Sequence, residues 1–115
     1  MINDLNKLLD TKCEFIGKKQ GCLSNQDALE LGKLVPQWAI SNDSLRLVRH
    51  FEFASYADSI AFVNKVATIA EANDHHPDIS IGFKTCTIEF WTHTVHGLTI
   101  NDYICAAKID AEFEV

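Results

Sequence analysis

Three helix-start signals divide this chain of 115 residues and limit the folds that it can adopt. Each signal is a serine or threonine followed three residues later by an aspartate, a pattern close to the capping box at helix N-termini. The three pairs are Ser24 with Asp27, Ser55 with Asp58, and Thr99 with Asp102. Apolar residues at helical spacing follow each pair, so we predict a first helix that Pro36 stops, a second that ends near Asn73, and a final helix after Thr99. The final helix is expected to pack through one apolar face, formed by Ile100, Tyr103, Ile104, Ala107 and Ala111.

The intervals between these helices carry the alternating pattern of strands. A short strand is expected at 38–41, and residues 45–53 alternate apolar and polar side chains almost perfectly, which indicates a strand with one buried face. Arg49 interrupts the apolar side and indicates either a sheet edge or a salt bridge. Residues 79–83 and 86–90 alternate in the same way, as a strand pair or one bent strand. Because the connections within each pair are too short for parallel pairing, we predict an α+β fold. Its four-stranded antiparallel sheet has helices packed on one face, in the order α-β-β-α-β-β-α.

The composition and charge exclude several classes of protein. Hydrophobic residues make up 47% and charged residues 23%, which is typical of a globular domain, and the net charge of −6 argues against direct binding to nucleic acid. No apolar run approaches the ~20 residues that cross a bilayer, and the charged N-terminus does not resemble a signal peptide. We therefore expect a cytoplasmic protein without membrane contact. Residues 1–20 are treated as an N-terminal extension with a short helix over Leu5, Leu8 and Leu9, and residues 21–115 as a single domain.

The four cysteines do not form the CxxC pairs of a zinc ribbon. Cys86 and Cys105 fall at apolar positions of predicted elements, so we expect them to be buried thiols. Cys13 and Cys22 lie in the less patterned N-terminal stretch, where a disulfide between them would be disfavoured in a reducing compartment.

Four of the five histidines gather at the ends of predicted elements. His75 and His76 are adjacent in the loop after the second helix, whereas His93 and His96 follow the last strand. Such ends can meet at one side of a sheet, so the sequence permits one pocket lined by three or four imidazoles. Histidine suits proton transfer because its ordinary pKa is about 6.5, and nearby carboxylates can tune it. The carboxylates close in sequence are Glu71, Asp74, Asp78 and Asp102. Without a nucleophilic serine or cysteine in an elbow, this pattern indicates acid/base chemistry.

Plainer roles compete with this interpretation. The His-His pair can be no more than a polar turn that Pro77 makes rigid, and Glu71 can be an ordinary carboxylate on a helix surface. Asp102 has a structural role as the capping partner of Thr99. A metal site is disfavoured, because adjacent histidines rarely aim at one ion and the chain lacks an HxH pattern, a helical HxxxH pattern or a cysteine partner.

Two segments resemble motifs of the pterin-4a-carbinolamine dehydratase family. Residues 71–77 match the family's Glu-x-x-x-His-His-Pro motif, and residues 92–102 match its Thr-His-x-x-x-Gly-Leu-[Ser/Thr]-x-x-Asp segment with the same internal spacing. The resemblance covers roughly residues 22–112, including the Trp38 region, the aromatic strand before the long helix and the last helix. Three positions depart from the family pattern and affect packing and pocket shape: Ile79, Phe83 and Trp91.

The resemblance implies a dehydratase that converts a 4a-hydroxytetrahydropterin into a quinonoid dihydropterin and water during tetrahydrobiopterin recycling. It implies no metal and no cofactor, since imidazoles transfer the protons. The catalytic residues that it implies are His75, His76 and His93, with support from Glu71 and Asp102. The substrate-binding residues that it implies are His75, His76, Pro77, Thr92, His93, Thr94 and Val95.

The family also bears on assembly and on a rival function. Its members form tetramers, so the resemblance implies a homo-oligomer built as a dimer of dimers. Some relatives serve as dimerisation partners of a transcription factor, and others have been linked to the assembly of another enzyme. The alternative function is therefore a non-catalytic interaction protein.

Overall fold

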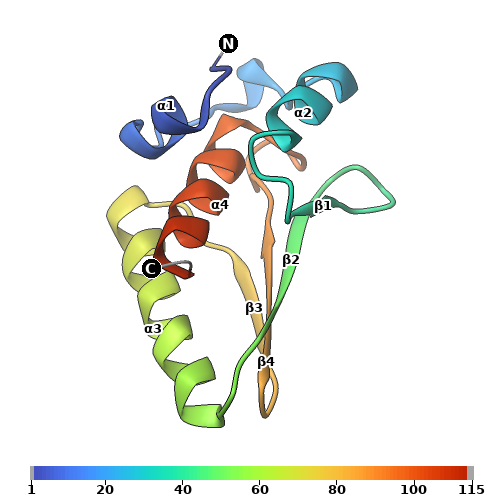
Figure 1. Cartoon of the computed structure of the whole chain (residues 1–115). Helices are drawn as coiled ribbons and strands as arrows, with labels where there is room; N and C mark the ends of the chain where they lie inside the picture. The colour runs from blue at the N-terminus through green and yellow to red at the C-terminus, as the bar shows by residue number, and fades with distance from the viewer. Residues whose placement is uncertain (1, 114–115) are drawn as a thin grey trace.

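The structure is a computed structural model that describes residues 2–113 and has the predicted α+β architecture. The helices are α1 (Leu5–Asp10), η1 (a 3-10 turn, Lys18–Gln20), α2 (Asn25–Gly32), α3 (Tyr56–Asn73) and α4 (Ile100–Phe113). The strands are β1 (Ala39–Ile40), β2 (Leu47–Glu52), β3 (Asp78–Ile81) and β4 (Thr85–Phe90). They form one sheet in the order β1-β2-β4-β3 with antiparallel neighbours throughout. Figure 1 shows α3 and α4 side by side on one face of this sheet, with α1 and α2 together at one end of the molecule.

The predicted helix starts are confirmed by hydrogen bonds at the caps. The Ser24 hydroxyl accepts a hydrogen bond from the backbone N–H of Asp27 at 3.1 Å, and the Ser55 hydroxyl accepts one from Asp58 at the same distance. Helix α2 ends at Gly32, four residues before Pro36, and the chain continues in a series of turns. Among the helices of residues 2–113, none combines the length and the hydropathy needed to cross a membrane.

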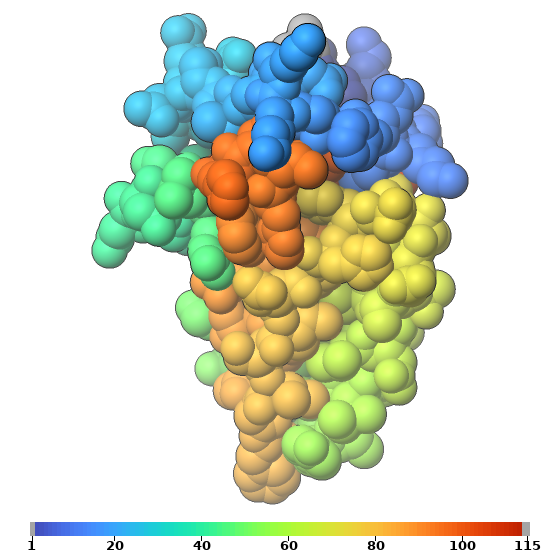
Figure 2. Space-filling view, turned by 180° about the vertical axis from the view of Figure 1, so that it is seen from behind, coloured from blue at the N-terminus to red at the C-terminus, as the bar shows by residue number. Residues whose placement is uncertain are grey.

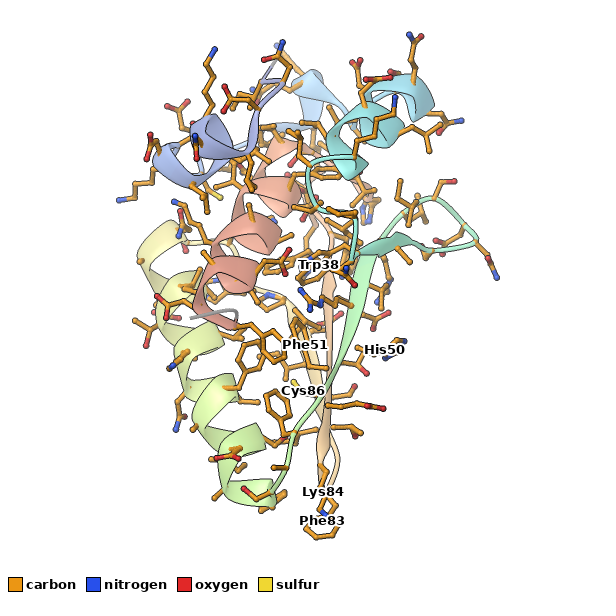
Figure 3. The ribbon with its side chains drawn as sticks, viewed as in Figure 1. Trp38, His50, Phe51, Phe83, Lys84 and Cys86 are labelled. Carbon is orange, nitrogen blue, oxygen red and sulfur yellow. The ribbon has the colours of Figure 1, made fainter. Side chains whose placement is uncertain are left out.

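The core lies between the sheet and helices α3 and α4. Phe51 of β2 and Cys86 of β4 point into this space, whereas His50 points away from it, as the alternation predicts (Figure 3). Arg49 is bonded to Asp110 of α4 through a 2.6 Å contact between Nη1 and Oδ1. The salt-bridge interpretation of Arg49 is therefore confirmed. Strand β2 is an inner strand, but β1 pairs with it only at Leu47 and Val48, so Arg49 lies beyond the end of β1.

Helix α4 is buried on more sides than the sequence indicates. Ile104 and Ala107 are buried as expected, but the neighbouring Cys105 and Ala106 are buried too, and Ala111 is exposed. The reason is that α1 packs on the outer side of α4 and inserts the fully buried side chain of Leu8 into the core. The N-terminal residues are thus part of the packed structure.

Candidate active site

The end of α3 delivers two of the candidate histidines. Asp74 adopts the left-handed conformation with φ of 48°, and the N–H of His75 reaches back to the carbonyl of Ala70 at 3.2 Å. The N–H of Asp74 bonds to the carbonyl of Glu71 at 3.3 Å, so the helix ends in a Schellman-like turn. Aspartate tolerates the left-handed region better than most residues. This turn ends α3 and is followed directly by His75 and His76.

His75 is held by a carboxylate that is completely inaccessible to solvent. Its Nε2 lies 2.6 Å from Oδ1 of Asp102, and its ring stacks on Phe90 with 5.8 Å between the ring centroids and 7° between the planes. Burial by itself lowers the pKa of His75, but the hydrogen bond to Asp102 and the charge of that carboxylate outweigh it, so the pKa is raised. The arrangement favours the protonated form of His75.

Asp102 binds the start of α4 and His75 at the same time, so the predicted capping role is confirmed. Its Oδ2 accepts the backbone N–H of Thr99 and the hydroxyl of Thr92, each at 2.9 Å, so it caps α4 while Oδ1 binds the histidine. The two threonine hydroxyls are 2.7 Å apart. Burial and the charge of Asp102 also raise the pKa of Tyr103 to about 12, and that phenol donates to the carbonyl of Ala28. Every buried polar side-chain atom of the described residues has a partner.

The carboxylate partner of His76, in contrast, is exposed to solvent. The Nε2 atom of His76 lies 2.8 Å from Oε1 of Glu71 in the last turn of α3, with side chains 53% and 78% exposed. A pair this exposed contributes little to stability, since water competes for both partners. It can nevertheless orient the His76 imidazole.

The third histidine stands on a tight turn after β4. Thr92 and Gly97 pair across the base of this turn, with the N–H of Thr92 bonded to the carbonyl of Gly97 at 2.9 Å. A Cβ at Gly97 would lie 3.0 Å from the Cβ of Cys22, so a larger residue here would have to displace the Cys22 side chain. His93 projects from the turn with its ring 4.1 Å from that of Trp91. His96 has φ of 52°, the left-handed conformation, directly before Gly97.

Two contacts hold the Trp91 side chain, one on the face of its ring and one at its ring nitrogen. The guanidinium carbon of Arg46 lies 4.9 Å above its ring, and its Nε1 donates to Oδ2 of Asp78 at 3.3 Å. Trp91 therefore gives His93 an aromatic support.

These side chains face one cavity of about 560 Å³. Its lining comes from four parts of the chain: Lys12–Ile16, Glu71–His76, Trp91–Thr94 and Asn101. The three predicted catalytic histidines, Glu71, Thr92 and Thr94 are thus brought together, and Asp102 lies behind His75. Pro77, Val95 and His96 lie outside the lining of this cavity. Figure 2 shows the N-terminal part of the chain over the segment that follows β4 and next to the end of α3.

The sequence did not indicate the contribution of Lys12–Ile16. These residues have no periodic pattern, and the available signal was Cys13, since free cysteine is among the residue types most often buried. Cys13 is buried with its Sγ 3.6 Å from that of Cys105, and the four cysteines are free thiols. The hydrogen bond from Cys105, with the charges of His75 and Lys108, outweighs burial and lowers the pKa of Cys13.

Within residues 2–113, no group of three or more His, Cys, Asp and Glu side chains has the arrangement of a metal site. The lining is instead a set of imidazoles, two of which are paired with carboxylates. Such a set can donate and accept protons near neutral pH.

Comparisons with known proteins agree on one family. The model of the family described as pterin 4 alpha carbinolamine dehydratase matches residues 22–112. A relative in Xylella fastidiosa (strain 9a5c), whose name assigns it to these dehydratases, is 41% identical over 113 residues, 98% of this chain and 97% of that protein. One from Nitrosospira multiformis with the same assignment is 41% identical over 115 residues, 100% of both chains.

Two solved structures are similar as well. A protein from Brucella melitensis described as a transcriptional coactivator/pterin dehydratase superposes with a TM-score of 0.75 at 24% identity, over 79% of this chain and 97% of that one. This likeness supports the fold alone. A pterin dehydratase-like protein described as a RuBisCO assembly factor in the alpha-carboxysome has a TM-score of 0.57 at 28% identity, over 65% of this chain and 87% of that one.

Proposed function

The chain belongs to the pterin 4 alpha carbinolamine dehydratase family, and from this premise we propose that it removes water from a 4a-hydroxytetrahydropterin by histidine acid/base catalysis. The observation that carries the proposal is the convergence of three imidazoles from two separate segments on one cavity. Two of them have carboxylate partners within 2.8 Å. The physiological setting that we propose is the recycling of tetrahydrobiopterin.

The reaction needs two proton transfers. The hydroxyl on C4a accepts a proton so that the C–O bond breaks and water leaves. The adjacent ring nitrogen supplies its lone pair to a new C=N bond and then loses its proton. One proton enters and one departs, so the products are a quinonoid dihydropterin and water, and no electrons are gained or lost. Imidazoles with pKa values near neutrality can serve both steps.

We assign proton transfer at the leaving hydroxyl to His76 and His93, the two more exposed imidazoles of the lining. His75 is assigned to pterin binding or to the second acid/base step. Its pairing with Asp102 favours the charged form, which can donate a hydrogen bond to an acceptor on the pterin ring. The edge formed by Thr92 and Thr94 offers further polar groups to that ring.

Replacement of the histidines tests this proposal. His76→Ala and His93→Ala should each lower kcat on the order of 10²-fold, the usual contribution of general acid/base catalysis. Rates are measured above the spontaneous dehydration, which otherwise masks an inactive variant. The matched control is His96→Asn, because His96 lies outside the cavity lining and asparagine accepts its left-handed backbone. This control should stay within a few-fold of wild type. Equal activities of His76→Ala and His96→Asn would refute the assigned roles.

The proposal includes no metal and no cofactor. Treatment of the purified protein with a strong chelator should leave the dehydration rate unchanged, because among the described residues no three His, Cys, Asp or Glu side chains are arranged to hold a metal ion. A loss of activity that zinc or iron restores would contradict acid/base catalysis by free imidazoles.

We further propose a homo-oligomer, in the form of a tetramer built as a dimer of dimers. Among the described strands, β3 is the longer of the two outer strands, and a free strand edge can pair with another chain. The apolar side chains of α4 are used inside the chain, so the sheet edge is the better candidate for the contact. Light scattering at micromolar concentration should give an oligomer, and a monomer would contradict the proposal.

A non-catalytic interaction role is the second candidate. The description of one similar structure as an assembly factor favours it, since that chain shares the fold at 28% identity. The double variant His76→Ala, His93→Ala separates the two candidates. A binding role would survive this change of cavity side chains, whereas a dehydratase would lose its activity.

A further inference from the structure

Five consecutive residues outside the family match form one wall of the cavity. We call Lys12–Ile16 the N-terminal strap. It runs between α1 and η1 without helix or strand geometry of its own. The alignment with the relative from Nitrosospira multiformis covers 100% of both chains, so that protein has a counterpart of this region. The strap is therefore more than an appendage of this one chain.

Three side chains bind the backbone of the strap. The side-chain amide of Asn101 binds both backbone groups of Glu14. Its Nδ2 donates to the Glu14 carbonyl at 2.6 Å, and its Oδ1 accepts the Glu14 N–H at 3.3 Å. Asn73 accepts the N–H of Cys13 at 3.3 Å, and the hydroxyl of Thr94 donates to the carbonyl of Ile16 at 2.6 Å. Both asparagines are buried.

The positions of these anchors connect the strap to the site. Asn73 lies two residues before His75, Thr94 directly follows His93, and Asn101 directly precedes Asp102. Each segment that carries a candidate site residue thus also holds the strap. A wall anchored at three points keeps a fixed distance from the imidazoles, which a substrate-contacting surface requires.

Phe15 is the strap side chain best suited to touch a ligand. It lines the cavity and is 83% exposed, whereas the other aromatic side chain of the lining, Trp91, already packs on His93. The free face of an aromatic ring binds a flat heterocycle by stacking and by loss of water from both surfaces. Together with Ile16 of the strap, Phe15 adds apolar surface that a pterin ring can cover to a lining that also carries the imidazoles.

Resting on the proposed function, we propose that the N-terminal strap is the substrate-contacting wall of this site and that Phe15 packs against the ring of the bound pterin. Phe15 carries no proton that the reaction could use. It is a specificity-determining residue, and it contributes equally to the binding of the substrate and of the transition state. Such a contribution appears in KM and leaves kcat unchanged.

The experiment compares two exposed phenylalanines. Phe15→Ala should raise KM roughly tenfold, the scale of one aromatic stacking contact with its apolar area, with kcat within about twofold of wild type. Phe83→Ala is the matched control, because Phe83 is 71% exposed at the tip of the β3–β4 hairpin, at the opposite end of the sheet from the strap (Figure 3). Phe15→Tyr should keep the wild-type KM, since the ring is retained.

The dissociation constant of dihydrobiopterin, measured by calorimetry, gives a readout that does not depend on turnover. Phe15→Ala should weaken this binding by the same factor, and Phe83→Ala should not change it. A wild-type protein that dehydrates its substrate while Phe15→Ala keeps a normal KM would overturn the strap proposal alone. A wild-type protein without turnover would overturn the proposed function, and the binding measurement would still decide the role of Phe15. Absence of dihydrobiopterin binding by wild type would overturn both.

Discussion

His75 and His76 are adjacent in the chain and line the same cavity, yet their carboxylate partners lie in different surroundings. The side chains of His75 and Asp102 are 11% and 0% exposed, whereas those of His76 and Glu71 are 53% and 78% exposed. The contact distances, 2.6 Å and 2.8 Å, are almost the same. We call the first pair with Thr92 and Thr99 the buried half of the site, and the second pair with Trp91 and His93 the exposed half.

The difference between the halves follows from the local dielectric environment. An ion pair in water is screened and hydrated, so its formation changes the free energy of unfolding little. The same pair inside the protein interacts more strongly, and loss of one partner leaves the other without hydration. The buried half should therefore support the fold as well as the site, while the exposed half, under the proposed function, is accessible to a ligand in the cavity.

The largest expected effect is on Asp102. Asp102→Ala removes the acceptor of the His75 imidazole, of the Thr92 hydroxyl and of the cap at Thr99, all from a position without solvent access. We expect the free energy of unfolding to fall by about 3–5 kcal/mol, the usual consequence of breaking a buried pair. Urea denaturation followed by circular dichroism measures it.

The matched change in the exposed half is Glu71→Ala. It removes the carboxylate that lies 2.8 Å from His76, close to the 2.6 Å between Asp102 and His75, but at a position exposed to solvent. Its free energy of unfolding should stay within about 0.5 kcal/mol of wild type. If the two alanine variants were equally destabilised, the comparison between the halves would be wrong.

A smaller effect is expected from the pH dependence of stability. The pKa of His75 is raised in the folded protein, so folding is favoured by protonation of this residue. The stability that His75 contributes is then fully present below about pH 6.5, the ordinary pKa of an unfolded histidine, and is lost as the pH rises through the raised value. The difference in unfolding free energy between wild type and His75→Gln should therefore shrink with increasing pH. A difference that grows with pH would show that the imidazole is buried in its neutral form.

The sequence predicted the parts of this molecule that depend on local pattern. The caps at Ser24 and Ser55 join residues three positions apart, and the burial of β2 alternates with a period of two. Both patterns are contained within a few residues, so they can be recognised in the sequence. The contact between Glu71 and His76 is local as well, since one helix end holds both, but the sequence indicated only that Glu71 lies near the two histidines. The family motifs then indicated which polar residues share a cavity.

Long-range contacts could not be predicted from the periodicity of the chain, and only the family resemblance implied that Asp102 supports the histidines. The contact between His75 and Asp102 spans 27 positions, and the contact between Asn101 and Glu14 spans 87. Hydrogen bonds from a side chain to a distant backbone leave no trace in the hydrophobic pattern, because any residue can supply the backbone group. For this reason the strap was interpreted as an extension, and α4 was expected to show one buried face instead of the burial that α1 produces.

The smallest expected effect separates charge from hydrogen bonding in the exposed half. Glu71→Gln removes the negative charge but keeps an oxygen that can accept from Nε2 of His76, at a side chain that is 78% exposed. Water and salt already screen this charge, so stability should not change measurably, and kcat should fall no more than a few-fold. The isosteric change in the buried half, Asp102→Asn, leaves the cap at Thr99 and the Thr92 hydroxyl with a weaker acceptor in a dry environment, so its loss of stability should be clearly larger. Measuring both variants at low and high ionic strength sharpens the comparison. Any effect of Glu71→Gln should diminish as salt is added, whereas that of Asp102→Asn should persist because ions do not reach it. A salt-independent effect of Glu71→Gln would place Glu71 in direct contact with the reacting substrate and would move it from a supporting role to a catalytic one.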